Sequence, residues 1–151
     1  LNGAAVYQNQ ALKLDTDTEN KTGHGGGIYF IAESYPNSPD NQAEVDKYTK
    51  VILINQGTGT AAAVYNNTAA VNGGGIYMES SENTELRVQG GYISSNSANN
   101  GGGIYMTGKN ATCYVEGGII GGEGNDSNGK PLANLANKAA DGSGGNGGGK
   151  L

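Results

Sequence analysis

The chain has 151 residues, 28 of them glycine, with a net charge of −5 and an isoelectric point near 4.7. This acidic balance argues against a nucleic-acid partner, which would need a basic surface. The sequence has no apolar run long enough for a membrane-spanning helix, so we expect no direct membrane insertion. Its length fits roughly one domain.

Two short sequence elements recur along the chain. The first, small-small-x-apolar-x-x-Asn-x-Ala, occurs at residues 3–11, 61–69 and 90–98. The second, Gly-Gly-Gly-Ile-Tyr, occurs at residues 25–29, 73–77 and 101–105, with a degraded copy at 147–151. Gly73 and Gly101 lie 28 residues apart. Self-similarity of this kind indicates a stack of structural repeats.

The intervals between the other glycine triplets are longer because each contains a polar insertion. These insertions lie near residues 31–50 and near residues 122–140. Repeat proteins carry such insertions in loops on the outside of the stack. Between the loops, apolar residues come in short β-branched and aromatic bursts bounded by Gly, Asn and Ser, for example Val51–Ile54. This pattern is typical of short strands and predicts an all-β chain.

A 28-residue repeat with short strands fits one coil of a parallel β-helix, a solenoid whose strands pair with their equivalents about 4.8 Å away. We therefore predict one β-helix segment over residues 1–151, with about four to five coils and two loop insertions. Both ends of the chain fall inside a repeat, so we expect an excerpt of a longer solenoid or a unit that stacks end to end with copies of itself.

Stacking of coils would place identical positions above one another. The isoleucine of each triplet would form an internal apolar ladder, and the recurrent asparagine would form a ladder at a bend, where its amide can bond backbone and neighbouring coils. The residues concerned are Ile28, Ile76 and Ile104 in the first ladder and Asn9, Asn67 and Asn96 in the second.

The combination of Asn-x-Ala with Gly-Gly-Gly-Ile-Tyr resembles the right-handed parallel β-helix repeats of bacterial surface proteins, including adhesins of the polymorphic outer-membrane protein type. The Phe-x-x-Asn motif of that type is replaced here by aliphatic residues, as in Val6-Tyr7-Gln8-Asn9. The resemblance implies a right-handed helix and an extracellular or cell-surface location.

Tyrosines follow the inward isoleucine in each triplet, so strand alternation points them outward as an exposed aromatic ladder. They are Tyr29, Tyr77 and Tyr105. One interpretation is stacking between coils that stabilises the sheet. The other is a platform that binds the faces of sugar rings.

Two acidic stretches are candidates for calcium, the one ion that the sequence suggests, although we expect no cofactor. Asp15, Asp17 and Glu19 alternate and would share one face of an extended segment. Residues 121–126 match the start of a calcium-binding nonapeptide, but that motif works in tandem copies and occurs once here. The alternative is a solvated loop edge.

A further acidic group follows the second triplet. Glu79, Glu82 and Glu85 could line a groove with Arg87, and paired carboxylates are what polysaccharide hydrolysis needs. Equivalent positions in other repeats are uncharged, so a solvated turn is the interpretation we favour, and we expect no enzymatic activity.

His24 and Cys113 are the only residues of their types. His24 stands directly before a glycine triplet, where other copies have asparagine, and is interpreted as a polar turn residue. A catalytic or metal site would depend on this one histidine. Cys113 is expected to be a buried ladder residue, with a reactive or intermolecular thiol as the alternative.

These features together predict a non-catalytic structural or adhesive segment, a stalk or display scaffold of an extracellular surface protein. The partners expected are glycans, host-surface proteins or copies of the chain itself. Two alternatives remain open. The first is a polysaccharide-active β-helix enzyme or carbohydrate-binding module, and the second is a filament subunit that stacks end to end.

Overall fold

The computed structural model describes residues 1–32, 50–55, 62–80, 84–108, 111–121 and 135–136. None of these residues lies in a helix. The strands are β1 (Ala5–Tyr7), β2 (Gln10–Ala11), β3 (Ile28–Ala32), β4 (Lys50–Ile54), β5 (Ala63–Tyr65), β6 (Thr68–Ala69), β7 (Ile76–Ser80), β8 (Thr84–Ser94), β9 (Ser97–Ala98), β10 (Ile104–Gly108), β11 (Ala111–Ile120) and β12 (Leu135–Ala136).

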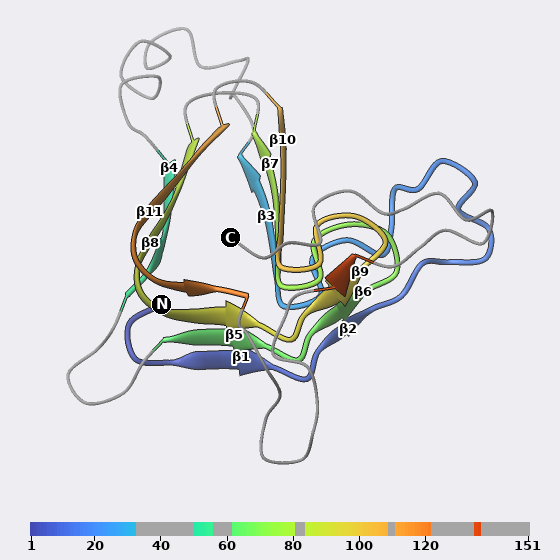
Figure 1. Ribbon diagram of the computed structural model, residues 1–151. Helices are drawn as coiled ribbons and strands as arrows, with labels where there is room; N and C mark the ends of the chain where they lie inside the picture. Colours follow the sequence, from blue (N-terminus) through green and yellow to red (C-terminus); the bar gives the residue numbers. More distant parts are fainter. Residues whose placement is uncertain (33–49, 56–61, 81–83, 109–110, 122–134, 137–151) are drawn as a thin grey trace, which may run out of the picture.

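These strands form three sheets in which every pairing is parallel (Figure 1). The first sheet has the order β1-β5-β8-β11, and β4 also pairs with β8. The second has the order β3-β7-β10, and the third β2-β6-β9-β12. This arrangement confirms the prediction of an all-β chain with parallel strands.

The chain crosses the sheets in four successive passes, which we define by their strands: β1–β3, β4–β7, β8–β10 and β11–β12. The long strands β8 and β11 bend, so that the start of β8 pairs with β4 and its end pairs with β5 (Figure 1). Equivalent residues of neighbouring passes are aligned, as in the register Ile28↔Ile76↔Ile104. Residues at equivalent positions of the sequence repeat are therefore register partners in the sheets.

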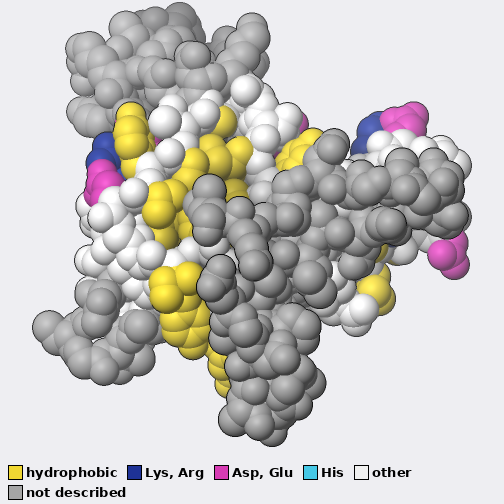
Figure 2. Space-filling model, in the orientation of Figure 1, with side chains coloured by type: hydrophobic (Ala, Val, Ile, Leu, Met, Phe, Trp, Pro, Cys, Tyr) yellow, Lys and Arg dark blue, Asp and Glu magenta, His cyan; other side chains and the backbone are white. Residues whose placement is uncertain are grey.

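The hydrophobic core lies between the first sheet and the second (Figure 1). It takes side chains from β4, β5, β7 and β8, together with Ala62, and all of them come from the second and third passes. Apolar residues of the first and fourth passes pack against this core but stay partly exposed. Figure 2 shows hydrophobic side chains at the surface between β11 and β10. Burial is therefore greatest in the middle of the stack.

The glycine triplets bring adjacent passes close together. The first glycine of each triplet has a left-handed conformation, with φ of 65° at Gly25, 67° at Gly73 and 58° at Gly101. Glycine adopts this conformation without strain because it has no Cβ. The third glycine leaves room for an asparagine, because a Cβ at Gly75 would lie 2.9 Å from Nδ2 of Asn96. The triplets are thus required by both the bend and the packing.

Most of the two predicted insertions lies outside the described residues, as does the degraded triplet at 147–151. The described ends of these regions belong to strands: residues 31–32 close β3, Lys50 opens β4 and residues 135–136 form β12. A further excursion, residues 12–24, connects β2 to β3 and projects from the stack (Figure 1). We had not predicted it as an insertion.

Candidate functional site

The triplet isoleucines stack in register on the inner side of the second sheet. Ile76 is fully buried in the core, whereas Ile28 and Ile104 on either side of it are partly buried. The apolar ladder therefore has one member enclosed by neighbours and two members at its ends.

The recurrent asparagines form a hydrogen-bonded ladder at the turn between the first and third sheets. Oδ1 of Asn67 accepts hydrogen bonds from the backbone N and Nδ2 of Asn9, at 3.1 and 3.0 Å. Asn67 in turn donates from its backbone N and from Nδ2 to Oδ1 of Asn96, each at 3.0 Å. Asn67 and Asn96 also donate from Nδ2 to a backbone carbonyl of the preceding pass. For Asn96 the acceptor is Val64 O, at 2.9 Å.

The local backbone explains this geometry. The residue before each ladder asparagine is left-handed although it is not glycine, with φ of 57° at Gln8 and 55° at both Asn66 and Ser95. Such a conformation is uncommon for residues with a Cβ. It turns the chain sharply between β1 and β2 and their equivalents. Because Asn67 and Asn96 are completely buried, their amides act in the stack and not at the surface.

The triplet tyrosines also stack. The rings of Tyr29 and Tyr77 are 5.1 Å apart and inclined by 7°, and those of Tyr77 and Tyr105 are 5.7 Å apart and inclined by 3°. The expectation that the whole row is exposed is wrong, because Tyr77 is only 6% exposed whereas Tyr29 is 50% exposed. The two neighbouring rings cover both faces of Tyr77.

His24 provides further cover for Tyr77. The two rings lie 4.7 Å apart, and Nε2 of His24 is 2.6 Å from the carbonyl oxygen of Asn20. Nε2 is the donor in this contact because a carbonyl oxygen only accepts, and the buried Nδ1 has no hydrogen-bond partner in the described part of the chain. The hydroxyl of Tyr77 donates to Glu79 at 2.9 Å. Burial, together with this carboxylate, raises the pKa of Tyr77 above its usual value.

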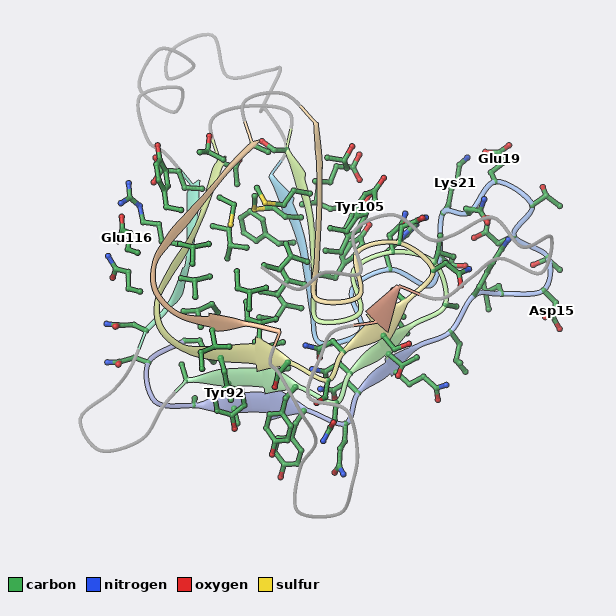
Figure 3. The ribbon with its side chains drawn as sticks, in the orientation of Figure 1. Asp15, Glu19, Lys21, Tyr92, Tyr105 and Glu116 are labelled. Atoms are coloured by element: carbon green, nitrogen blue, oxygen red, sulfur yellow. The ribbon has the colours of Figure 1, made fainter. Side chains whose placement is uncertain are left out.

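A second tyrosine row lies on the outer side of the first sheet, and we had not singled it out. Tyr7 and Tyr65 stack at 5.1 Å and 8°, and Tyr92 follows at 5.8 Å with a tilt of 45°. Figure 3 places Tyr92 beneath the first sheet and Tyr105 on the far side of β10, so the two rows belong to different faces. The repeat of Val-Tyr at residues 6–7 and 64–65 could have revealed Tyr7 and Tyr65, whereas Tyr92 is in register with Ala63 and does not follow that pattern.

Beside this second row is a shallow, open cleft of about 520 Å³. Its lining consists only of uncharged polar residues: Gln8, Asn9, Gln10, Asn66, Thr68 and Ser95. They come from three successive passes at the turn that carries the asparagine ladder. The cleft therefore offers amide and hydroxyl groups without a formal charge.

The described members of the predicted acidic groove lie in different elements of the structure. Glu79 lies in β7 and Glu85 in β8, which belong to different sheets, and Glu82 is outside the described residues. Arg87 instead donates to Glu85 at 2.6 Å and to Glu116 of the next pass at 3.1 Å. These contacts raise the pKa of Arg87, mainly through the hydrogen bond that its guanidinium donates to Glu85.

Two more contacts hold the group formed by Arg87, Glu85 and Glu116. The Arg87 guanidinium lies 4.7 Å from the ring centre of Tyr114, and Gln89 donates to Glu116 at 2.6 Å. The Arg87 and Glu116 side chains are partly exposed, so this ion pair contributes little stability. Glu85 and Glu116 thus both accept hydrogen bonds from Arg87, and neither is a free carboxylate.

The alternating carboxylates of the 12–24 excursion diverge. Figure 3 shows Asp15 and Glu19 at separate points of this excursion. Asp17 caps the turn internally: its Oδ2 accepts from the backbone N and Oγ1 of Thr22, both at 2.7 Å, and its Oδ1 from the backbone N of Glu19 at 3.2 Å. These hydrogen bonds hold the pKa of Asp17 well below its usual range, the one from the Thr22 side chain contributing most.

Cys113 is exposed, which corrects the expectation of a buried ladder residue. Its register partner is the fully buried Leu86, so the position itself faces inward. The difference arises because no described strand pairs with the far side of β11. Partial desolvation still raises the pKa of the Cys113 thiol.

No group of three or more His, Cys, Asp or Glu side chains within the described ranges could hold a metal ion. The same ranges contain no helix of the length and apolarity needed to cross a bilayer. Comparison with protein-family models, curated proteins and solved structures gave no match for this chain.

Proposed function

We propose that this chain is a segment of right-handed parallel β-helix that serves as a non-catalytic stalk or display scaffold of an extracellular surface protein. The observation that carries the proposal is the in-register asparagine ladder, in which the buried amides of Asn67 and Asn96 bond each other and the backbone of the preceding pass. Side chains held in this way fix one pass on the next, which is the role of a scaffold.

The strand pairing and the general handedness of parallel crossovers also support a right-handed solenoid. Strands of successive passes pair in parallel with matched residues, and glycine, isoleucine and tyrosine positions coincide between passes. Parallel crossovers are right-handed in nearly all proteins, in agreement with the resemblance of the repeats to bacterial surface β-helices. That resemblance also supports the extracellular location. Of the acidic residues considered for hydrolysis, Glu79 and Glu85 lie in different sheets.

A scaffold should unfold as a coupled unit and should leave its surroundings chemically unchanged. We expect native-state hydrogen exchange to show the amides of β5, β7 and β8 exchanging slowly and together, because each pass is paired with both neighbours. Separate exchange of the second sheet would contradict the proposal. In parallel, incubation with polysaccharides should release no new reducing ends or unsaturated sugars; their appearance would show an enzyme.

A second candidate function is assembly by end-to-end stacking. The observation in its favour is the partial exposure of Ile28 and Phe30 on the first pass and of Ile104 and Met106 on the third, next to fully buried equivalents in the second. Strand edges with apolar neighbours attract further strands. Concentration-dependent fibres in negative-stain electron microscopy would support this function, and a monomer at high concentration would exclude it.

A further inference from the structure

The face formed by Tyr7, Tyr65 and Tyr92 differs from the other tyrosine row in what surrounds it. The cleft beside it is lined by six polar residues, none of them charged. The row of Tyr29, Tyr77 and Tyr105 has instead a carboxylate, Glu79, bonded to its central hydroxyl, and His24 packed on the same ring. The first face is therefore the one where aromatic and neutral polar groups coincide.

The polar groups of this face are arranged in columns. Gln10, Thr68 and Ser97 are in register across β2, β6 and β9, and Gln10 and Thr68 are exposed. Gln8, Asn66 and Ser95 form a second column with nearly the same left-handed conformation. Because parallel strands lie about 4.8 Å apart, each column repeats hydrogen-bonding groups at that interval along the stack.

Tyr7 supplies an aromatic surface at one end of these columns. Its side chain is 49% exposed, and one face of its ring is stacked on Tyr65. The opposite face has no aromatic partner among the described residues. An aromatic ring with a free face packs well against the C–H face of a sugar ring, while its hydroxyl stays hydrated.

We propose that this face, the tyrosine row with its polar cleft, binds an extended neutral polysaccharide that lies along the stack with one sugar ring on Tyr7. The amides and hydroxyls of the columns match the repeated hydroxyl groups of such a polymer. A nucleic acid or an acidic polysaccharide would need cationic side chains, and the cleft lining has none. This inference adds a ligand to the scaffold and does not depend on the stalk function.

The two tyrosine rows provide a matched pair of variants. Tyr7 and Tyr29 are 49% and 50% exposed, and each stacks on one inner ring at 5.1 Å. Tyr7→Ala and Tyr29→Ala should therefore lose similar stability, which thermal unfolding followed by circular dichroism would check. Any difference between them in polysaccharide binding then reports the face and not the fold.

Binding would be measured by affinity electrophoresis of the whole chain in gels containing xylan, galactomannan or mixed-linkage β-glucan, with polygalacturonate as the charged polymer. We expect retardation by at least one neutral polymer. Tyr7→Ala should weaken it about fivefold to tenfold, whereas Tyr29→Ala should leave it unchanged. Gln10→Ala should weaken it too, and Thr112→Ala, at an exposed position of β11, should not.

Three results would overturn the proposal. The first is no retardation by any neutral polymer. The second is an equal loss in Tyr29→Ala and Tyr7→Ala, which would place binding elsewhere or in the stack as a whole. The third is retardation by polygalacturonate alone. None of them bears on the coupled hydrogen exchange that tests the scaffold.

Discussion

The first and second passes carry the same residues at several register positions, among them the triplet isoleucine and tyrosine, but these residues differ in burial. Ile76 is fully buried and Tyr77 is 6% exposed, whereas Ile28 is only partly buried and Tyr29 is 50% exposed. The side chains are identical, and the difference comes from having a neighbouring pass on both sides or on one. In a stacked protein, the contribution of a residue depends on its place in the stack as much as on its type.

The largest expected difference between the passes is in the apolar ladder. Ile76→Ala removes a fully enclosed side chain and leaves a cavity, which should lower the free energy of unfolding by about 4 kcal/mol. Ile28→Ala should cost about half as much, because its site is already partly open. Urea denaturation would measure both. Equal losses would show that the first pass is as well enclosed as the second.

The asparagine ladder should give the next largest difference. Asn67→Ala removes an acceptor for Asn9 and a donor to Asn96 and to Val6 O, and should cost about 3 kcal/mol because buried groups lose their partners. Asn9→Ala lies at the exposed end of the ladder and should cost about 1 kcal/mol. The comparison uses chemical denaturation again. A smaller effect at Asn67 than at Asn9 would contradict the ladder's role.

Alkaline pH should separate the tyrosines of the two passes. The pKa of Tyr77 is raised above its unfolded value of 10.0, so its contribution to stability is fully present below pH 10 and is lost as the pH rises towards the folded pKa. Tyr77→Phe has no such proton to lose and should show a shallower alkaline decline in melting temperature. Unchanged alkaline behaviour in Tyr77→Phe would mean that the burial of the hydroxyl is unimportant.

The smallest effect should be in the excursion of the first pass. The pKa of Asp17 is depressed, so its stabilisation of the turn is present above the unfolded pKa and is lost as the pH falls through the folded one. Asp17→Asn should accelerate exchange of the Thr22 and Glu19 amides at neutral pH without changing the global melting temperature. A change in global unfolding would show that the excursion belongs to the cooperative stack.

Much of the arrangement was predictable because the repeat is visible in the residues. Identical triplets and Asn-x-Ala segments indicate equivalent positions, so the parallel sheets follow from the sequence. The bend at the recurrent asparagine was also predictable, but the left-handed conformation of the residue before it, as at Gln8 and Asn66, was not.

The exposure of individual copies was not predictable, because it depends on what lies above and below each pass. Alternation placed Tyr77 on the outer side, but it could not show that Tyr29, Tyr105 and His24 would cover it. The prediction for Cys113 was wrong in the opposite direction, because it was expected to be buried and is exposed. Its register position faces inward, but no described strand pairs with the far side of β11. The 12–24 excursion was not predicted. Its turn is held by hydrogen bonds from Glu19 and Thr22 to Asp17, and these three residues lie outside the two repeated sequence elements.

The backbone pairing of the triplets should also affect how fast the protein deamidates. Asn72-Gly73 is a dipeptide of the kind that deamidates readily in flexible chains, when the glycine nitrogen attacks the asparagine side chain. Here the Gly73 nitrogen donates to Asn100 O at 3.0 Å, and the Asn72 side chain accepts from Asn100 at 2.8 Å. Both reacting groups are held by the next pass, so the stack should slow the conversion of Asn72 to aspartate and isoaspartate and let the chain persist unrepaired for long periods.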